Sequence, residues 1–135
     1  MENLSKEHVR RVVNTIWNQL IATTSTDVIG SWGLSALSAT QISKKINDYD
    51  LDMAALIMTV EGFNFQGKVF VALDEGSDYY RIYFLKENNL EEQRADVGFD
   101  ELGTILDSLI ESGNMSQEEY YKRVENEYDC HLLII

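Results

Sequence analysis

Histidine and cysteine side chains are the first candidates for catalysis or metal binding in this sequence. The chain has two histidines, His8 and His131, and a single cysteine, Cys130. A zinc site needs three or four ligands, and the pair Cys130–His131 has no further cysteine or histidine at a suitable spacing. A Cys–His nucleophile would need the two side chains to face each other, which neighbours in a strand do not. We expect neither metal binding nor cysteine-based catalysis.

Acidic residues alternate at Asp48, Asp50 and Asp52, which is the spacing of the first ligands in a calcium-binding loop. Such a loop requires Gly at its sixth position and Glu at its twelfth, where this chain has Met53 and Thr59. The calcium motif therefore fails.

Two loops could hold phosphate or paired carboxylates. The segment from Gly62 to Gly67 lacks the following Lys-Ser/Thr and helix of a phosphate-binding loop. Asp74, Glu75 and Asp78 lie in a predicted turn, where solvation is the common reason for acidic residues. We expect no cofactor, and a non-enzymatic protein is favoured over an enzyme that uses carboxylates alone.

The composition is that of one globular domain spanning residues 1–135, with 44% hydrophobic and 25% charged residues. A lone cysteine suits a reducing cytoplasm. The first residues, Met1-Glu2-Asn3, do not resemble a secretory signal, and no segment reaches the roughly 20 apolar residues of a membrane-spanning helix. We expect a cytoplasmic protein without a membrane segment.

The net charge of −12 is concentrated in the carboxyl half of the chain. Residues 1–73 hold six Lys/Arg and seven Asp/Glu, whereas residues 74–135 hold five and sixteen. This distribution disfavours direct binding to nucleic acid phosphates.

The stretch from Met53 to Lys86 contains three apolar runs separated by two turn segments. The runs cover 56–60, 69–73 and 79–85, and they are rich in β-branched and aromatic residues. They predict a three-stranded antiparallel meander. Residues 91–97 are expected to add a charged edge strand.

Amphipathic helices are predicted on both sides of the meander. Ser5 is a candidate N-cap for a helix ending near Ala22, with the apolar stripe Val9, Val12, Val13, Ile16, Trp17 and Leu20. Asp100 opens a second helix that Gly113 ends, and Ser116 opens a third. The prediction is an α+β fold, an antiparallel β-meander sheet with the N-terminal helix and the C-terminal helices packed on one face.

Residues 25–47 are compatible with two structures. The uncharged run Val28–Ser43 favours a hairpin that turns near Gly33 and is buried on both faces. The alternative is a loop followed by a short helix from Ala39 to Ile46. Residues 47–52 are expected to form a polar connection into the meander.

Strand parity divides the sheet residues into two faces. Charged residues should avoid the helix-covered face, which assigns to the core Leu56, Met58, Val60, Val69, Val71, Leu73, Tyr80, Ile82 and Phe84. The second face then carries Ile57, Phe70, Tyr79, Tyr83 and Leu85 around Arg81 and Thr59.

This second face is too apolar for a solvated surface. Cover by the chain itself, by residues 28–42 or the carboxyl tail, is favoured. The functional interpretation is a homodimer or a protein partner, with a candidate interaction face made of Ile57, Phe70, Tyr79, Arg81 and Tyr83. The loop aromatics Phe63 and Phe65 are expected to fold back onto the sheet.

Three segments carry a resemblance to a known group of proteins. They are Ile16-Trp17-Asn18-Gln19-Leu20, the run VFVALDEGSDYYRIYF at 69–84, and VGFDEL at 97–102. The chain resembles small, largely uncharacterised proteins encoded by phages and mobile elements of gut Bacteroidetes. The resemblance implies an α+β fold and a mobile-element origin, and it supplies no catalytic residue.

The leading functional hypothesis is a non-enzymatic protein-interaction or accessory factor of phage or mobile-element type that acts through the second sheet face. The alternative is an acidic nucleic-acid mimic that inhibits a host DNA-binding enzyme. In that case the carboxylates of Glu118, Glu119, Glu125 and Glu127 would take the place of phosphates.

Overall fold

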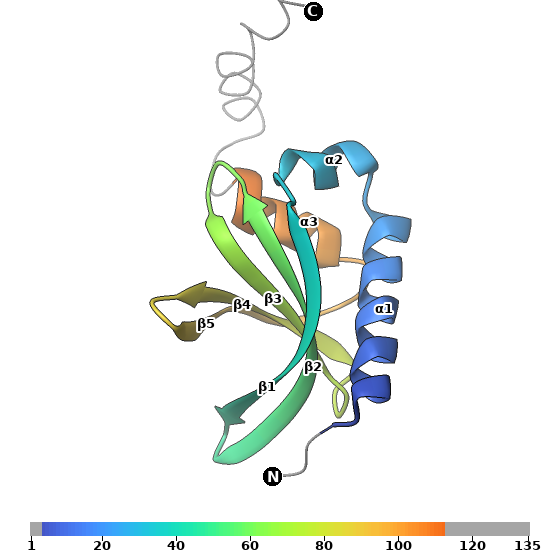
Figure 1. Cartoon of the computed structure of the whole chain (residues 1–135), viewed down its shortest axis with the longest axis vertical. Helices are drawn as coiled ribbons and strands as arrows, with labels where there is room; N and C mark the ends of the chain where they lie inside the picture. Colours follow the sequence, from blue (N-terminus) through green and yellow to red (C-terminus); the bar gives the residue numbers. More distant parts are fainter. Residues whose placement is uncertain (1–3, 113–135) are drawn as a thin grey trace, which may run out of the picture.

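The computed structural model describes residues 4–112, which form one antiparallel sheet and the helices that cover it (Figure 1). The elements are α1 (Lys6–Thr23), α2 (Thr26–Ser31), β1 (Ala36–Ile46), β2 (Tyr49–Glu61), β3 (Gln66–Asp74), β4 (Tyr79–Lys86), β5 (Asn89–Val97), α3 (Leu102–Asp107) and the π-helical turn η1 (Ser108–Ser112). The predicted α+β fold is confirmed.

The sheet is an up-and-down meander in the order β1-β2-β3-β4-β5, with every neighbouring pair antiparallel. Two of its connections are two-residue turns, Asn47-Asp48 and Glu87-Asn88, in which both residues have positive φ. Such turns match the twist of the strands they join, and Asn and Asp tolerate positive φ better than most residues. β5 lies at one edge of the sheet, as predicted.

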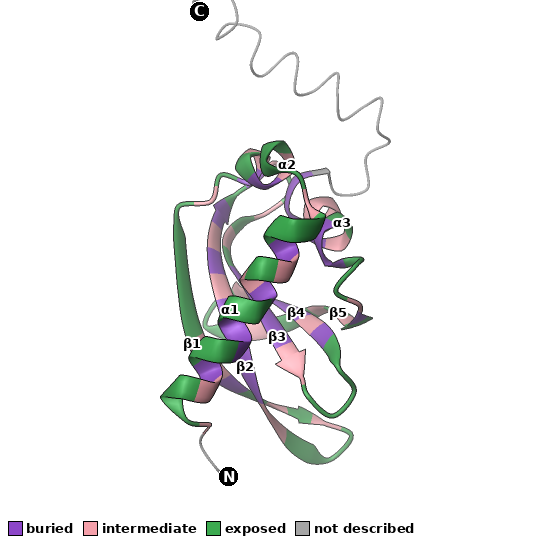
Figure 2. Cartoon of the chain, turned by 90° about the vertical axis from the view of Figure 1, so that its right-hand side faces the viewer, coloured by how far each residue is buried: buried purple, intermediate pink, exposed green. Residues whose placement is uncertain are grey.

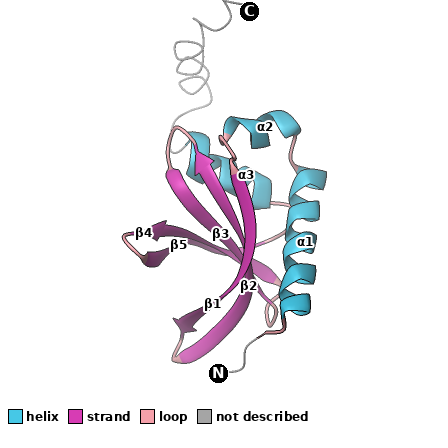
Figure 3. Cartoon of the chain, viewed as in Figure 1, coloured by secondary structure: helices cyan, strands magenta, loops and turns pink. Residues whose placement is uncertain are grey.

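The described helices α1, α2 and α3 lie on one face of the sheet, whereas the β1–β2 and β4–β5 hairpin ends project to the other side (Figure 3). The side chain of Ser5 accepts a hydrogen bond from the His8 backbone N–H and thereby caps α1. The buried stripe of α1 faces the sheet and its exposed side faces outward, as Figure 2 shows.

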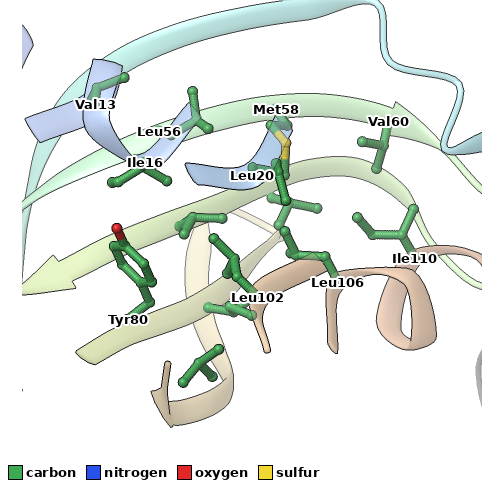
Figure 4. Close-up of a cluster of buried hydrophobic side chains, with 14 of the residues drawn as sticks. Val13, Ile16, Leu20, Leu56, Met58, Val60, Tyr80, Leu102, Leu106 and Ile110 are labelled. Carbon is green, nitrogen blue, oxygen red and sulfur yellow. The ribbon is translucent and has the colours of Figure 1, made fainter. Parts of the chain in front are cut away.

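The main core lies between this helical layer and the sheet (Figure 4). Eight of the nine sheet residues assigned to the core by parity are buried there, and Leu73 is half-buried against the same cluster. Alternation therefore identified the helix-covered face correctly.

Residues 26–46 follow neither expectation in full, although β1 overlaps the second strand of the expected hairpin. Residues 26–31 form α2, capped by the Ser25 side chain, so no hairpin turns near Gly33. Residues 36–46 form β1, which excludes the alternative helix from Ala39 to Ile46. The expected polar connection at 47–52 is also wrong, because only Asn47-Asp48 form a turn.

Burial of the uncharged run on both faces is wrong for a further reason. β1 is an edge strand, and its first four residues are exposed (Figure 2). By contrast Trp32, at the end of α2, is fully buried and donates from Nε1 to Asp107 Oδ1 at 3.0 Å. The absence of charge thus has different causes at the two ends of the run.

The loop between β2 and β3 contacts the end of the C-terminal helical segment. The backbone N–H groups of Asn64 and Phe65 both donate to the Ile110 carbonyl, at 3.0 and 3.1 Å. Phe65 also stacks on Phe84 with ring centroids 3.7 Å apart, which confirms that this aromatic folds back onto the sheet. The loop is therefore held against η1 by two hydrogen bonds to a single backbone carbonyl.

The second predicted helix corresponds to α3 and η1, which begin at Leu102. Its expected end at Gly113 and the third helix from Ser116 lie outside the described residues, as do Cys130 and His131.

Candidate functional site

The five residues of the candidate interaction face are all on the sheet side that lacks helices, but their exposure differs. Phe70 and Tyr83 are 8% and 1% exposed, Ile57 and Arg81 are half-buried, and Tyr79 is 46% exposed. Phe70 and Tyr83 belong to a second buried cluster with Ile42, Met53, Ala55 and Ala72. The favoured expectation, cover by the chain itself, is confirmed for these two aromatics.

The cover comes mainly from the curvature of the sheet. Lys44 on β1 donates from Nζ to the Leu90 carbonyl on β5 at 3.0 Å, which joins the two edge strands across the second face. The same ammonium lies 5.7 Å from the centre of the Tyr83 ring. The sheet thus closes partly over its own apolar residues, and Ile42 is the contribution of the expected segment 28–42.

A polar cavity of about 250 Å³ remains at the rim of this second cluster. Its lining residues are Lys44, Lys45, Ile46, Arg81, Tyr83 and Glu92. Arg81 Nη1 is 2.8 Å from Glu92 Oε1, and Arg81 Nε is 3.7 Å from Asp74 Oδ2. These ion pairs hold the guanidinium group in place on the cavity wall.

The Tyr83 hydroxyl is the most unusual group in this cavity. Burial, and then the negative charge of Glu92, raise the pKa of Tyr83 to about 12. Within residues 4–112, neither this hydroxyl nor Arg81 Nε makes a hydrogen bond of normal length and angle, although Glu92 and Arg81 lie beside the hydroxyl and Asp74 Oδ2 lies 3.7 Å from Nε. A buried phenol without such a bond is uncommon in a folded protein, so it marks the cavity for attention.

The raised pKa of Tyr83 predicts a loss of stability at alkaline pH. Between pH about 10 and about 12 the folded protein holds the phenol proton that the unfolded chain has released, so stability falls as pH rises. From about pH 9 to about pH 12, the unfolding free energy of the wild type should fall by about 2 kcal/mol more than that of Tyr83→Phe. Urea unfolding at both pH values measures this, and equal losses in both proteins would contradict it.

A second candidate site lies on the helix side of the sheet, in a groove between α1 and the edge strand β1. One part of the groove, about 220 Å³, is lined by apolar and uncharged residues that include Val13, Trp17, Leu37 and Leu56. Ala39 lines this part and also an adjacent part of about 340 Å³. We call these two parts together the α1–β1 groove.

The charge of the α1–β1 groove is opposite to that of the chain as a whole. Among residues 4–112, its larger part is lined by Lys6 and Arg10 and by no carboxylate. Residues 1–46 hold five Lys/Arg and three Asp/Glu, whereas residues 47–135 hold six and twenty. This groove was not predicted from the sequence. The available signal was the uncharged run Val28–Ser43, for which burial was expected.

In residues 4–112, no group of three or more His, Cys, Asp or Glu side chains is placed to hold a metal ion. No described helix combines the length and apolar character needed to cross a bilayer. Comparisons with protein-family models, with curated proteins and with solved structures found no match for this chain.

Proposed function

We propose that this chain is a non-enzymatic interaction protein that binds an extended, acidic segment of a partner protein along β1. The observation that carries the proposal is the outer edge of β1, with which no other strand of residues 4–112 pairs. This strand has no charged residue from Ala36 to Ser43 and is exposed over its first four residues. Proteins ordinarily protect such edges with charges, prolines or bulges.

The opposite edge of the sheet has this protection. β5 carries Glu91, Glu92, Arg94 and Asp96, its pairing with β4 shifts register, and Asp96 has a positive φ. A bulged and charged strand resists pairing with another chain. The contrast between the two edges favours β1 as the place where an additional strand is accepted.

The chemistry of the groove defines the partner segment. An added strand would continue the sheet through backbone hydrogen bonds, and alternate side chains would enter the α1–β1 groove. Val13, Trp17 and Leu37 offer an apolar surface there, while Lys6 and Arg10 favour carboxylates. The expected segment therefore alternates apolar and acidic residues.

This proposal keeps the class of function expected from the sequence but moves the contact surface. Burial of Phe70 and Tyr83 leaves little of the second face for a protein partner. A role as a phage or mobile-element accessory factor is carried by the sequence resemblance. The nucleic-acid-mimic alternative depends on Glu118, Glu119, Glu125 and Glu127, which lie outside the described residues.

A defined peptide tests the proposal. We expect a short synthetic peptide of alternating valine and glutamate to bind, and to slow hydrogen exchange at β1 amides that face away from β2. A peptide of alternating valine and lysine should bind at least about threefold more weakly, because it meets Lys6 and Arg10. Amide-resolved NMR measures both affinity and exchange.

Charge reversal on α1 supplies a matched comparison. Arg10→Glu changes a residue that lines the groove, whereas Arg11→Glu makes the same charge change at an exposed neighbour that does not. Arg10→Glu should weaken binding of the acidic peptide about threefold or more relative to Arg11→Glu. Equal affinities, or protection of β5 amides in place of β1, would refute strand addition at β1.

A further inference from the structure

We propose that the polar cavity at the rim of the second sheet face binds a small oxyanion, a carboxylate or a phosphate group. This cavity lies on the opposite side of the sheet from the α1–β1 groove. The inference is therefore independent of the proposed peptide binding.

The first support is a set of hydrogen-bond donors that are not fully satisfied. The Tyr83 hydroxyl and Arg81 Nε meet no acceptor at normal hydrogen-bond geometry within residues 4–112, although Glu92 lies beside the hydroxyl and Asp74 Oδ2 lies 3.7 Å from Nε. Tyr83 is 1% exposed. The Lys44 ammonium uses one N–H for the Leu90 carbonyl, and such a group carries three. These three side chains all line the cavity, so a bound group that supplies several acceptor oxygens would satisfy them.

The protonation state of these groups supports the same ligand chemistry. Since its pKa is raised to about 12, the Tyr83 phenol keeps its proton near neutral pH and acts as a donor. Arg81 and Lys44 donate as cations, and hydrogen bonds from cations to oxyanions are about twice as strong as those between neutral groups.

The charges around the cavity are close to balanced. Lys44 and Arg81 are opposed by Glu92 on the lining and by Asp74 beside Arg81, and Lys45, which is opposite Asp50 in the strand register, also lines the cavity. Glu92 is engaged with Arg81 at 2.8 Å, so it orients the guanidinium group. The surroundings of the cavity are therefore much less negative than the chain as a whole, whose net charge is −12.

The size of the cavity limits the ligand. Its volume of about 250 Å³ is below the roughly 300–1,000 Å³ of pockets that hold drug-sized molecules. Ile46 and the Tyr83 ring provide an apolar surface beside the donors. A small organic acid fits this combination, and inorganic phosphate shares its oxyanion chemistry.

The experiment is an NMR titration of the full chain with butyrate and, separately, with inorganic phosphate, at low and constant ionic strength. The readouts are the amide resonances of β4 and the Nε–H resonance of Arg81. Tyr83→Phe removes only the hydroxyl. Tyr79→Phe is the matched control, because Tyr79 lies on the same strand and the same face but is 46% exposed.

We expect saturable shifts at Arg81 and Tyr83 with at least one of the two anions. Tyr83→Phe should weaken that binding about fivefold or more, and Tyr79→Phe should leave it unchanged. Without ligand, Tyr83→Phe should melt at the same temperature as Tyr79→Phe or higher, since it loses a hydroxyl that makes no normal hydrogen bond. Lys44→Met should also weaken binding, and it replaces Tyr83→Phe as the test if that variant does not fold.

Three results would overturn the assignment. The first is the absence of saturable shifts with both anions. The second is undiminished binding by Tyr83→Phe and Lys44→Met. The third is a lower melting temperature of ligand-free Tyr83→Phe relative to Tyr79→Phe, which would mean that the hydroxyl already has an internal partner.

Discussion

Replacing Gly62 by alanine should destabilise the protein by about 3 kcal/mol or more, at the upper end of the effects seen for overpacked sites. A Cβ atom at Gly62 would lie 2.1 Å from the backbone oxygen of Ile110 and 2.6 Å from its side chain. The backbone oxygen cannot move away alone, because it accepts the N–H groups of Asn64 and Phe65. The substitution would therefore separate the β2–β3 loop from η1.

Gly30→Ala is the matched control for this prediction. Gly30 is exposed within α2, and an added Cβ would meet no atom within 4 Å. Alanine should therefore stabilise the protein, by up to about 1 kcal/mol, through its higher helix propensity. Urea unfolding of both variants gives the comparison. A cost below about 1 kcal/mol for Gly62→Ala would show that the loop and η1 are not packed as described.

Trp32→Ala should cost about 3–5 kcal/mol, because it removes a large side chain with no exposed surface. The indole also donates to the Asp107 carboxylate at 3.0 Å, and this bond joins α2 to α3. The loss therefore combines a cavity in the core with a carboxylate deprived of its donor. Chemical denaturation measures the change in unfolding free energy.

Two further variants separate these contributions. Trp32→Phe keeps much of the apolar volume but removes the N–H donor, so it should cost clearly less than alanine. Trp17→Ala removes the other tryptophan, which is only partly buried beside β1, and should cost about 1 kcal/mol. Equal losses for Trp17→Ala and Trp32→Ala would contradict the burial of Trp32.

The helix-covered face of the sheet could be predicted from the sequence because strand parity is strict. Lys68 and Arg81 each mark the face of their strand that the helices do not cover, and their neighbours Val69 and Ile82 then face the helices. Residues that pair across β3 and β4 have the same orientation, so one charged residue determines several core assignments.

The region from 25 to 47 could not be predicted because its composition has two physical causes. Trp32 and Ile29 lack charge because they are buried, whereas Ala36 and Ser38 lack charge on an exposed edge. Local pattern does not distinguish these cases. The Asn47-Asp48 turn was the signal that β1 pairs with β2, since Asn and Asp favour the positive φ that such a turn requires.

The cover over Phe70 and Tyr83 depends on contacts between distant parts of the sequence. Lys44 and Leu90 are 46 residues apart, and their hydrogen bond exists only because the twisted sheet brings its two edges near each other. Parity identified the polar residues of this face, including Arg81. The cavity between Arg81, Tyr83 and Glu92 results from the curvature of the sheet. Strand alternation gives no information about this curvature.

The order of the strands has a consequence for how the chain reaches its native state. Each strand pairs only with strands adjacent to it in the sequence, so the sheet can assemble hairpin by hairpin without closing a long loop first. The costly steps are then the two that join remote segments, the docking of α1 and the seating of the β2–β3 loop on η1. Until they occur, the apolar side of the nascent meander is open to water and to other chains.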